Sequence, residues 1–139
     1  MTVVLDSNLA AALALDPERA PAIEARLRSW EEAGESLHAP SLFRFEVANA
    51  LTRSIAAGAI DSTDAAVAWR RIVAIEIRLH ELVDGLAVIS VAGRLGRKSA
   101  YDAAYVALAE ELGAELWTLD GPLARNAASV AMPVRLLEA

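Results

Sequence analysis

The alternation of short apolar runs with longer helix-periodic segments constrains the fold of this chain more than any other feature. Residues 2–5 and 116–119 are short runs of apolar and β-branched side chains, and each stops at an aspartate, Asp6 or Asp120. Apolar runs of this length favour strands that are buried on both faces. Strands that alternate with helices of ten or more residues imply a parallel sheet. The sequence therefore predicts an α/β fold with three layers, α/β/α, around a central, mostly parallel sheet.

The helical segments are bounded by residues typical of helix ends. Asp16 with Pro17, and Ser99 with Asp102 three residues later, have the form of helix starts, and glycines follow the last periodic residues. We read Gly121–Pro122 as a turn. We expect helices over 7–15, from Asp16 to Gly34, from Ser41 to Gly58, from Asp61 or Ser62 onward, over 86–95 and from Ser99 to Gly113, with further strands near 37–39, 79–83 and 132–136.

Length and composition limit what else the chain can be. Its 139 residues, 55% of them hydrophobic, suffice for one domain over 1–139. The absence of cysteine excludes disulfides, thiolate nucleophiles and cysteine-based zinc sites. The N-terminus resembles no secretion signal, and no apolar stretch approaches the roughly 20 residues of a membrane span. We therefore expect a soluble, cytoplasmic protein without membrane contact.

The charge of the chain argues against binding nucleic acid by bulk electrostatics. The net charge is −6 and the pI is near 4.9, whereas phosphate neutralisation needs a basic surface. That objection weakens if several carboxylates share one pocket, because a divalent cation bound there would reverse the local sign. Nearly all the basic residues are arginine, which suits bidentate phosphate contacts. The composition permits nucleic acid without indicating it.

Four acids are candidates for such a pocket. Asp6 and Asp120 follow predicted parallel strands, and ligands of open α/β sheets bind at the carboxyl ends of the strands. Asp102 lies in the first turn of a helix, and Glu46 lies on a helix whose opposite face carries Val47, Leu51 and Ile55. Each acid also has an ordinary structural interpretation, as a cap, a turn residue or a solvated side chain.

Four segments of the chain together resemble the PIN domain, and in particular the VapC toxins of bacterial toxin–antitoxin pairs. They are VVLDSN at 3–8, FEVANAL at 45–51, SAYDAAYVALAEELGAELWTLD at 99–120, and Leu123. Their order and spacing fit, and the resemblance spans essentially the whole chain. It implies a PIN-like fold, endonuclease activity on RNA with Mg²⁺ or Mn²⁺, and an acidic quartet of Asp6, Glu46, Asp102 and Asp120.

The resemblance also suggests roles within the site. We expect Asp6 and Asp102 as direct metal ligands, and Asp120 and Glu46 to bind a second metal or to orient water. Kinship with the toxins implies a homodimer and a cognate antitoxin whose C-terminal segment covers the site, often with an arginine. Candidates for orienting the ligands are Ser7, Asn8, Asn49 and Thr118, and candidates for RNA contact are Arg44 and Arg53, although local polarity explains these residues as well.

Two other functions compete with the nuclease. A phosphoryl-transfer domain fits poorly. A phosphatase of the haloacid dehalogenase type has a second Asp where position 8 is Asn, and a receiver domain has paired acids after its first strand and a lysine after a late strand, whereas Lys98, the only lysine, precedes a helix. A non-catalytic interaction module with the same fold has no evident need for four acids. His38 and His80 have no acidic or serine partner at a telling spacing, so we expect structural roles for them.

Overall fold

A parallel sheet forms the centre of the molecule, with five strands in the part of the chain that the structure describes. The computed structural model describes residues 2–82 and 84–138. Across the sheet the strand order is β3-β2-β1-β4-β5, and every neighbouring pair is parallel. The strands are β1 (Thr2–Leu5), β2 (Ser36–Pro40), β3 (Ile77–His80), β4 (Glu115–Thr118) and β5 (Val134–Leu136). The predicted parallel sheet is confirmed.

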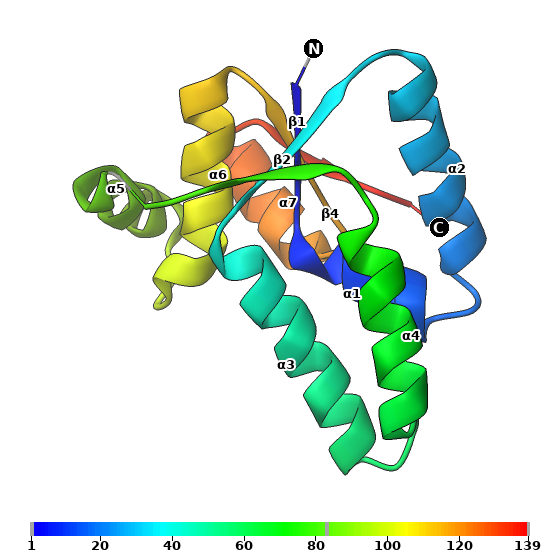
Figure 1. Ribbon diagram of the computed structural model, residues 1–139. Helices are drawn as coiled ribbons and strands as arrows, with labels where there is room; N and C mark the ends of the chain where they lie inside the picture. The colour runs from blue at the N-terminus through cyan, green and yellow to red at the C-terminus, as the bar shows by residue number, and fades with distance from the viewer. Residues whose placement is uncertain (1, 83, 139) are drawn as a thin grey trace.

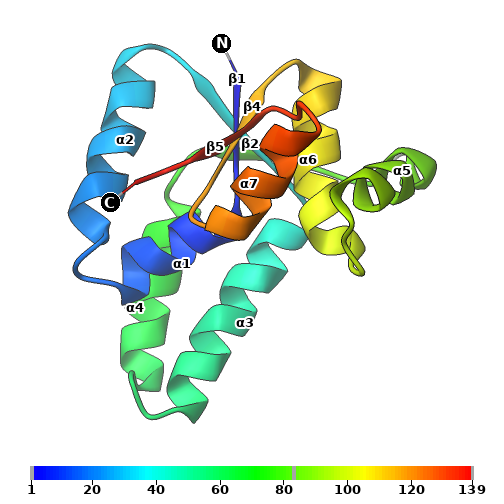
Figure 2. The ribbon, with the colours of Figure 1, turned by 180° about the vertical axis from the view of Figure 1, so that it is seen from behind.

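In the described ranges, seven helices connect the strands and cover both faces of the sheet. They are α1 (Ser7–Leu15), α2 (Ala20–Glu32), α3 (Leu42–Ala56), α4 (Ser62–Val73), α5 (Gly85–Leu95), α6 (Ala100–Leu112) and α7 (Gly121–Ser129). The chain moves outward from β1 to β3, then returns past β1 to β4 and β5. Because such crossovers are right-handed, this reversal puts α1–α4 on one face and α5–α7 on the other. Figures 1 and 2 show this separation from two sides.

The reversal also fixes where a site belongs. The strand order changes direction between β1 and β4, which pair from Val3 with Glu115 to Leu5 with Trp117. In open parallel sheets, ligands bind beyond the carboxyl ends of the strands at this switch point. Asp6 follows β1 there, and Asp120 follows β4 two residues after Thr118.

The core explains why these segments pack as they do. Val4 of β1 and Leu116 of β4 are fully buried between the two helical layers, as the apolar runs predict. The predicted buried face of the second helix is also present, with Ile23 and Trp30 buried and Leu27 partly so. Trp30 packs edge-on against Trp117 of β4, with ring centroids 5.5 Å apart. The helix thereby fastens to the sheet.

Several predicted boundaries are wrong. The second helix begins at Ala20, because the Asp16 side chain accepts hydrogen bonds from the backbone of Glu18 and Arg19 in a turn before it. The strand expected over 79–83 is Ile77–His80, and Val83 lies outside the described residues. The last strand begins at Val134 rather than at Met132.

Three local predictions fail for physical reasons. Gly121–Pro122 opens helix α7 instead of forming a simple turn, since proline fits the first turn of a helix. Ile55 does not continue the buried ridge of Val47 and Leu51, because α3 extends beyond the sheet there and leaves Ile55 40% exposed. Ser99 caps α6 through Tyr101 N, and the reciprocal bond from the Asp102 side chain is absent.

Across the described residues, no helix combines the length and apolar character needed to cross a bilayer.

Candidate active site

Asp6 lies at the centre of a hydrogen-bond network at the end of β1. Its side chain is 7% exposed, and its Oδ2 accepts hydrogen bonds from Thr118 Oγ1 at 2.8 Å and Asn8 Nδ2 at 3.3 Å. The pKa of Asp6 is raised to about 6, mainly by burial and further by the nearby charges of Asp102 and Glu46, against the hydrogen bond from Thr118, which lowers it. The ionised carboxylate of Asp6 therefore has acidic neighbours and, in the ranges that the structure describes, no nearby cation that stabilises its charge.

Glu46 reaches the same place from α3. The Tyr105 hydroxyl donates to Glu46 Oε1 at 2.6 Å, and Ser7 Oγ donates to the same oxygen at 3.2 Å. Ser7 also lies 3.5 Å from Asp6 Oδ1, so its hydroxyl stands between the two acids. Burial and the hydrogen bond to Glu46 raise the pKa of Tyr105, which keeps it as a neutral donor. The orientation of Glu46 is thus fixed by a buried tyrosine.

Asp102 projects from the first turn of α6 and is held less tightly. Arg97 Nη1 lies 3.4 Å from Asp102 Oδ2, beyond ordinary hydrogen-bond length. Burial raises the pKa of Asp102, the Arg97 charge lowers it, and the Asp120 charge raises it. The charge of Asp120 therefore makes ionisation of Asp102 less favourable.

Asp120 has a structural bond of its own. It is the N-cap of α7, and its Oδ1 accepts a hydrogen bond from Leu123 N at 2.9 Å. Its backbone N–H donates to Thr118 Oγ1 at 3.0 Å. One oxygen caps the helix, so the other carboxylate oxygen remains available to a ligand.

The four acids thus gather at one rim of the sheet, which we call the acidic rim: Asp6, Glu46, Asp102 and Asp120. Within residues 2–82 and 84–138, no three acidic or histidine side chains stand close enough to hold a metal ion as they are. The physical reason is that each carboxylate is turned toward its own donor while like charges repel. The oxygen donors suit a hard divalent cation, and side-chain rotation would have to close the set around it.

The residues expected to orient the acids divide into two groups. Ser7, Asn8 and Thr118 belong to the network, and Asn8 also accepts a hydrogen bond from Leu119 N at 3.1 Å. Asn49 is exposed and takes no part in it. The proposed RNA contacts Arg44 and Arg53 are exposed on α3, the helix that carries Glu46.

Sequence reasoning missed Tyr105 and Arg97. The sequence predicts no role for Tyr105 in the site. A tyrosine that is 1% exposed needs a partner for its hydroxyl, and that need is the signal that could have marked it. No signal in the sequence marks Arg97.

The two histidines do have partners. His38 Nδ1 lies 2.7 Å from His80 Nε2 on the neighbouring strand, and His38 Nε2 lies 2.9 Å from Ser36 Oγ. Burial, His80 and Arg78 lower the pKa of His38. The expectation of no serine partner is wrong, because Ser36 lies on the same face of β2. The pair connects two strands and stands apart from the acidic rim.

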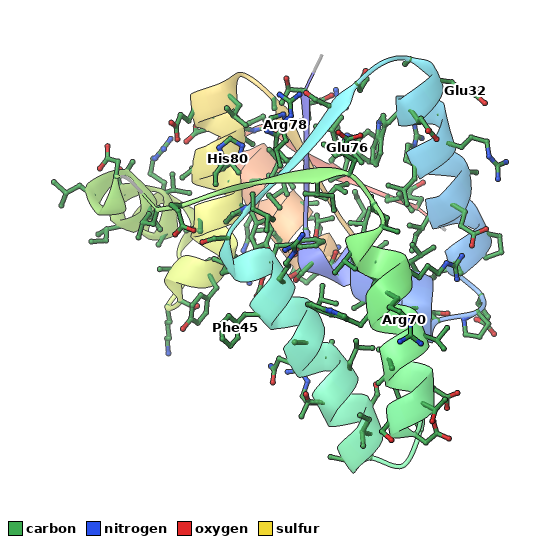
Figure 3. The ribbon with its side chains drawn as sticks, viewed as in Figure 1. Glu32, Phe45, Arg70, Glu76, Arg78 and His80 are labelled. Carbon is green, nitrogen blue, oxygen red and sulfur yellow. The ribbon has the colours of Figure 1, made fainter. Side chains whose placement is uncertain are left out.

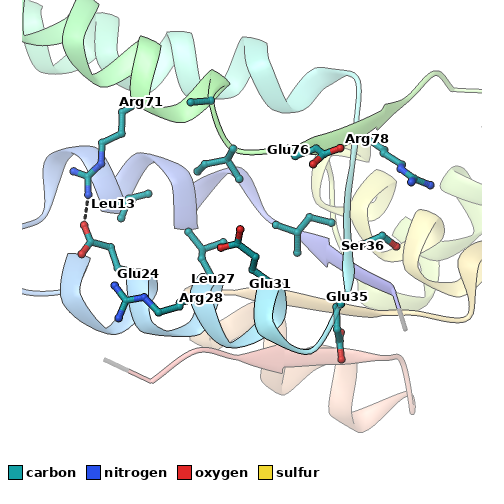
Figure 4. A pocket seen from close by; sticks show the side chains of 14 residues that line it. Leu13, Glu24, Leu27, Arg28, Glu31, Glu35, Ser36, Arg71, Glu76 and Arg78 are labelled. Carbon is teal, nitrogen blue, oxygen red and sulfur yellow. Dashed lines mark hydrogen bonds and ion pairs between the residues drawn. The ribbon is translucent and has the colours of Figure 1, made fainter.

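Two hollows of the surface lie outside the acidic rim. One has a volume of about 700 Å³ and lies between α2 and the α4–β3 segment, where Glu24 and Arg71 form an ion pair across it. Figure 4 shows its lining, with Leu27 on its apolar floor. The other lies between β3, α5 and α6. None of the four acids lines either hollow.

Comparison with known proteins agrees with this geometry. Residues 3–128 match the family model of the PIN domain. The chain is 33% identical over 139 residues to "Ribonuclease VapC3" of Pyrobaculum aerophilum, covering 96% of this chain and all of the relative. It is also 33% identical over 125 residues to "Ribonuclease VapC12" of Mycobacterium tuberculosis, covering 89% and 91%.

Solved structures show the same fold. PAE2754 from Pyrobaculum aerophilum superposes with a TM-score of 0.69 at 25% identity, covering 91% of this chain and 79% of that one. VapBC-1 from nontypeable Haemophilus influenzae gives a TM-score of 0.56 at 14% identity, covering 99% and 98%. With the family model, the near full-length relatives and the fold in agreement, the chain belongs to the PIN-domain family and, within it, to the VapC ribonucleases.

Proposed function

We propose that the acidic rim is the catalytic centre of a metal-dependent endoribonuclease that hydrolyses RNA phosphodiester bonds. The observation that carries this proposal is the electrostatic state of Asp6. A buried carboxylate whose pKa is raised by burial and by two neighbouring acids is an unfavourable arrangement unless a cation completes it. Perturbed groups of this kind concentrate at functional sites.

The residues of the rim would have different roles in the reaction. Asp6 and Asp102 are the proposed direct ligands of Mg²⁺ or Mn²⁺, and Asp120 and Glu46 would hold a second ion or orient water. A divalent cation held there supplies an activated water and stabilises the charge that develops on the phosphate. Thr118 and Asn8 fix the orientation of Asp6 through their hydrogen bonds, and Tyr105 fixes that of Glu46. Such outer partners keep ligands in productive orientations.

The test is cleavage of total RNA with and without Mg²⁺, followed by sequencing of the new ends. We expect discrete metal-dependent cuts by the wild type and a loss of roughly 100-fold or more in Asp6→Asn and Glu46→Gln, more than outer partners cost. The matched control is Glu32→Gln, an exposed glutamate at the end of α2 that Figure 3 shows away from the other labelled side chains. Full activity in Asp6→Asn would refute the assignment.

A metal titration separates the nuclease from a non-catalytic module with the same fold. Saturable Mn²⁺ binding that is lost in Asp6→Asn and Asp102→Asn supports the enzyme. No binding at millimolar metal supports a module that binds only macromolecules.

We further propose that the chain is the toxin of a toxin–antitoxin pair. Membership of the VapC ribonucleases supports this, and the similar structure from Haemophilus influenzae is of VapBC-1. An arginine from the antitoxin would find acceptors in the unneutralised rim. Addition of the product of a neighbouring short gene should abolish RNA cleavage, and undiminished cleavage would exclude that candidate.

A homodimer is supported by the apolar character of both faces of α5. Val88 and Val91 face the core, yet Leu86 is 78% exposed and Ile89 65% exposed on the outer face. A helix that is apolar all round is normally covered on all sides. We propose that a second copy covers α5, so Ile89→Lys should give a monomer in sedimentation while the wild type sediments as a dimer.

A further inference from the structure

The backbone at the end of α5 holds Arg97 beside the acidic rim. Gly96 ends the helix in the left-handed conformation with φ of 66°, and Arg97 N donates to Ala92 O at 3.0 Å. This closing bond is the usual helix-ending motif and fixes the residue after the glycine. The Arg97 side chain, 23% exposed, then reaches Asp102 with Nη1 alone.

The rest of the guanidinium is unused by the fold. Nε and Nη2 of Arg97 are buried and neither has a hydrogen-bond partner. These two nitrogens share one edge of the planar group, the edge that matches two oxygens of a carboxylate or a phosphate. Buried donors of a cation without an acceptor are unfavourable. A turn of the side chain toward an incoming acceptor would break no hydrogen bond at this edge.

We propose that the free edge of Arg97 binds two non-bridging oxygens of an RNA phosphate beside Asp102. This inference rests on the proposed function, since it requires RNA at the acidic rim. The rim repels phosphate by its own charge, and among the described residues Arg97 is the basic side chain paired with one of its acids. Arg97 is thus a positioning residue that holds the backbone of the substrate in register.

The competing explanation is that Arg97 serves only as the counter-ion of Asp102. The two roles differ in their consequences. A counter-ion competes with a metal for Asp102, so its removal tightens metal binding and leaves RNA affinity unchanged. A phosphate ligand contributes to RNA affinity and to its dependence on salt.

The experiment measures binding of a short, fluorescein-labelled, single-stranded 2′-O-methyl oligoribonucleotide of mixed sequence. Fluorescence anisotropy is recorded across a salt series with Ca²⁺ as the divalent ion, and a gel confirms that the probe stays intact. Arg97→Met should weaken binding about tenfold or more. It should also lower the slope of log affinity against log salt by about 0.7, the value for one phosphate contact to a single strand.

Two variants control the result. Arg97→Lys keeps the charge without the two-nitrogen edge, so its salt slope should match the wild type while its affinity falls. Arg70→Met makes the same charge change on the outer side of α4 and should bind like the wild type; Figure 3 labels Arg70 there. Since the edge makes no bond in the fold and the pair of Nη1 with Asp102 is long and partly exposed, Arg97→Met should melt close to the wild-type temperature.

The outcomes separate the two proposals. If the wild type cleaves RNA and Arg97→Met binds the probe equally well, the role of Arg97 is refuted and the nuclease stands. If the wild type neither binds nor cleaves, both are wrong. If Arg97→Met fails to fold, Arg97→Lys decides, because wild-type affinity with lysine would show that the edge is not needed.

Discussion

Tyr105 shows how much of the acidic rim depends on one buried hydroxyl. It is a full turn of helix from Asp102, and it donates the shortest hydrogen bond of the site, 2.6 Å to Glu46. Ser7 donates to the same oxygen but is bonded more loosely at 3.2 Å. The orientation of Glu46 is therefore set mainly from α6, the helix that also carries Asp102.

Tyr105→Phe should reduce RNA cleavage by about 10- to 100-fold, the range for loss of a partner that orients a metal ligand. The effect should fall on kcat and on Mn²⁺ affinity, because the ring still fills its place in the core. Both are measured by cleavage kinetics and calorimetric titration. Tyr101→Phe is the matched control, since Tyr101 lies on the same helix and is 66% exposed. Equal activity in the two variants would contradict the role of Tyr105.

The acids themselves could be predicted from the sequence, and their partners could not. Asp6 and Asp120 each follow an apolar strand, which is a pattern visible in the sequence. Because the two strands are parallel neighbours, their carboxyl ends, and with them the two acids, lie at the same edge of the sheet. Arg97 meets Asp102 only because a glycine turns the chain between two helices, and Tyr105 meets Glu46 only because α3 and α6 flank the same strand end. Such contacts depend on how the helices pack around the sheet, and the spacing of residues along the sequence does not predict that packing.

At the scale of elements, the end of α7 carries backbone strain. Ala131 follows the helix with φ of 55° and is the one non-glycine residue with positive φ in the described part of the chain. The same conformation is taken by glycine after α2, α5 and α6, at Gly34, Gly96 and Gly113. Left-handed backbone is costly for residues with a Cβ.

Ala131→Gly should therefore stabilise the protein by roughly 1 kcal/mol, less the extra entropy that glycine brings to the unfolded chain. Gly113→Ala is the mirror experiment and should destabilise by a similar amount, because its Cβ would meet no atom within 4 Å and only the backbone term changes. Urea denaturation of the two variants measures both. A destabilised Ala131→Gly would show that the conformation at 131 is not strained.

The helices that sequence reasoning misplaced are those whose first residues are set by side-chain hydrogen bonds rather than by apolar periodicity. The sequence predicts helix α1 over its full length, because the Ala- and Leu-rich segment and the helix end at the same residue, Leu15. The sequence does not predict helix α7, because Gly121 and Pro122 resemble a turn. In the structure the Asp120 side chain accepts a hydrogen bond from Leu123 N, so that Gly121 and Pro122 form the first turn of the helix. Helix α2 was started too early for the converse reason, since Asp16 caps a turn and not the helix.

At the scale of the whole molecule, the buried carboxylate of Asp6 in the acidic rim opposes folding at neutral pH. The folded pKa of Asp6 is about 6, above its ordinary 3.8, so the folded state holds a proton that the unfolded state has lost between these values. Stability contributed at this group is present below pH 3.8 and is lost as pH rises toward 6. Without a bound cation, the protein is therefore destabilised at neutral pH by this one carboxylate.

Asp6→Asn should remove this penalty. Without metal at pH 7 the variant should be more stable than the wild type by roughly 1–3 kcal/mol, and the difference should shrink as pH falls below 6. Comparison with the variant isolates Asp6 from His38, whose lowered pKa acts with the opposite sign by reducing stability as pH falls from 6.5. Denaturation midpoints across this pH range in chelator measure the difference.

Metal should reverse the order of the two proteins. Mn²⁺ at 1,000 times its dissociation constant would stabilise the wild type by about 4.1 kcal/mol through binding the folded state, which exceeds the penalty at Asp6. Asp6→Asn, which lacks the proposed ligand, should gain little and become the less stable of the pair. A wild type that is the more stable in chelator, or a variant that gains as much from Mn²⁺, would mean that the charge of Asp6 is already balanced within the chain and that no cation is required at the rim.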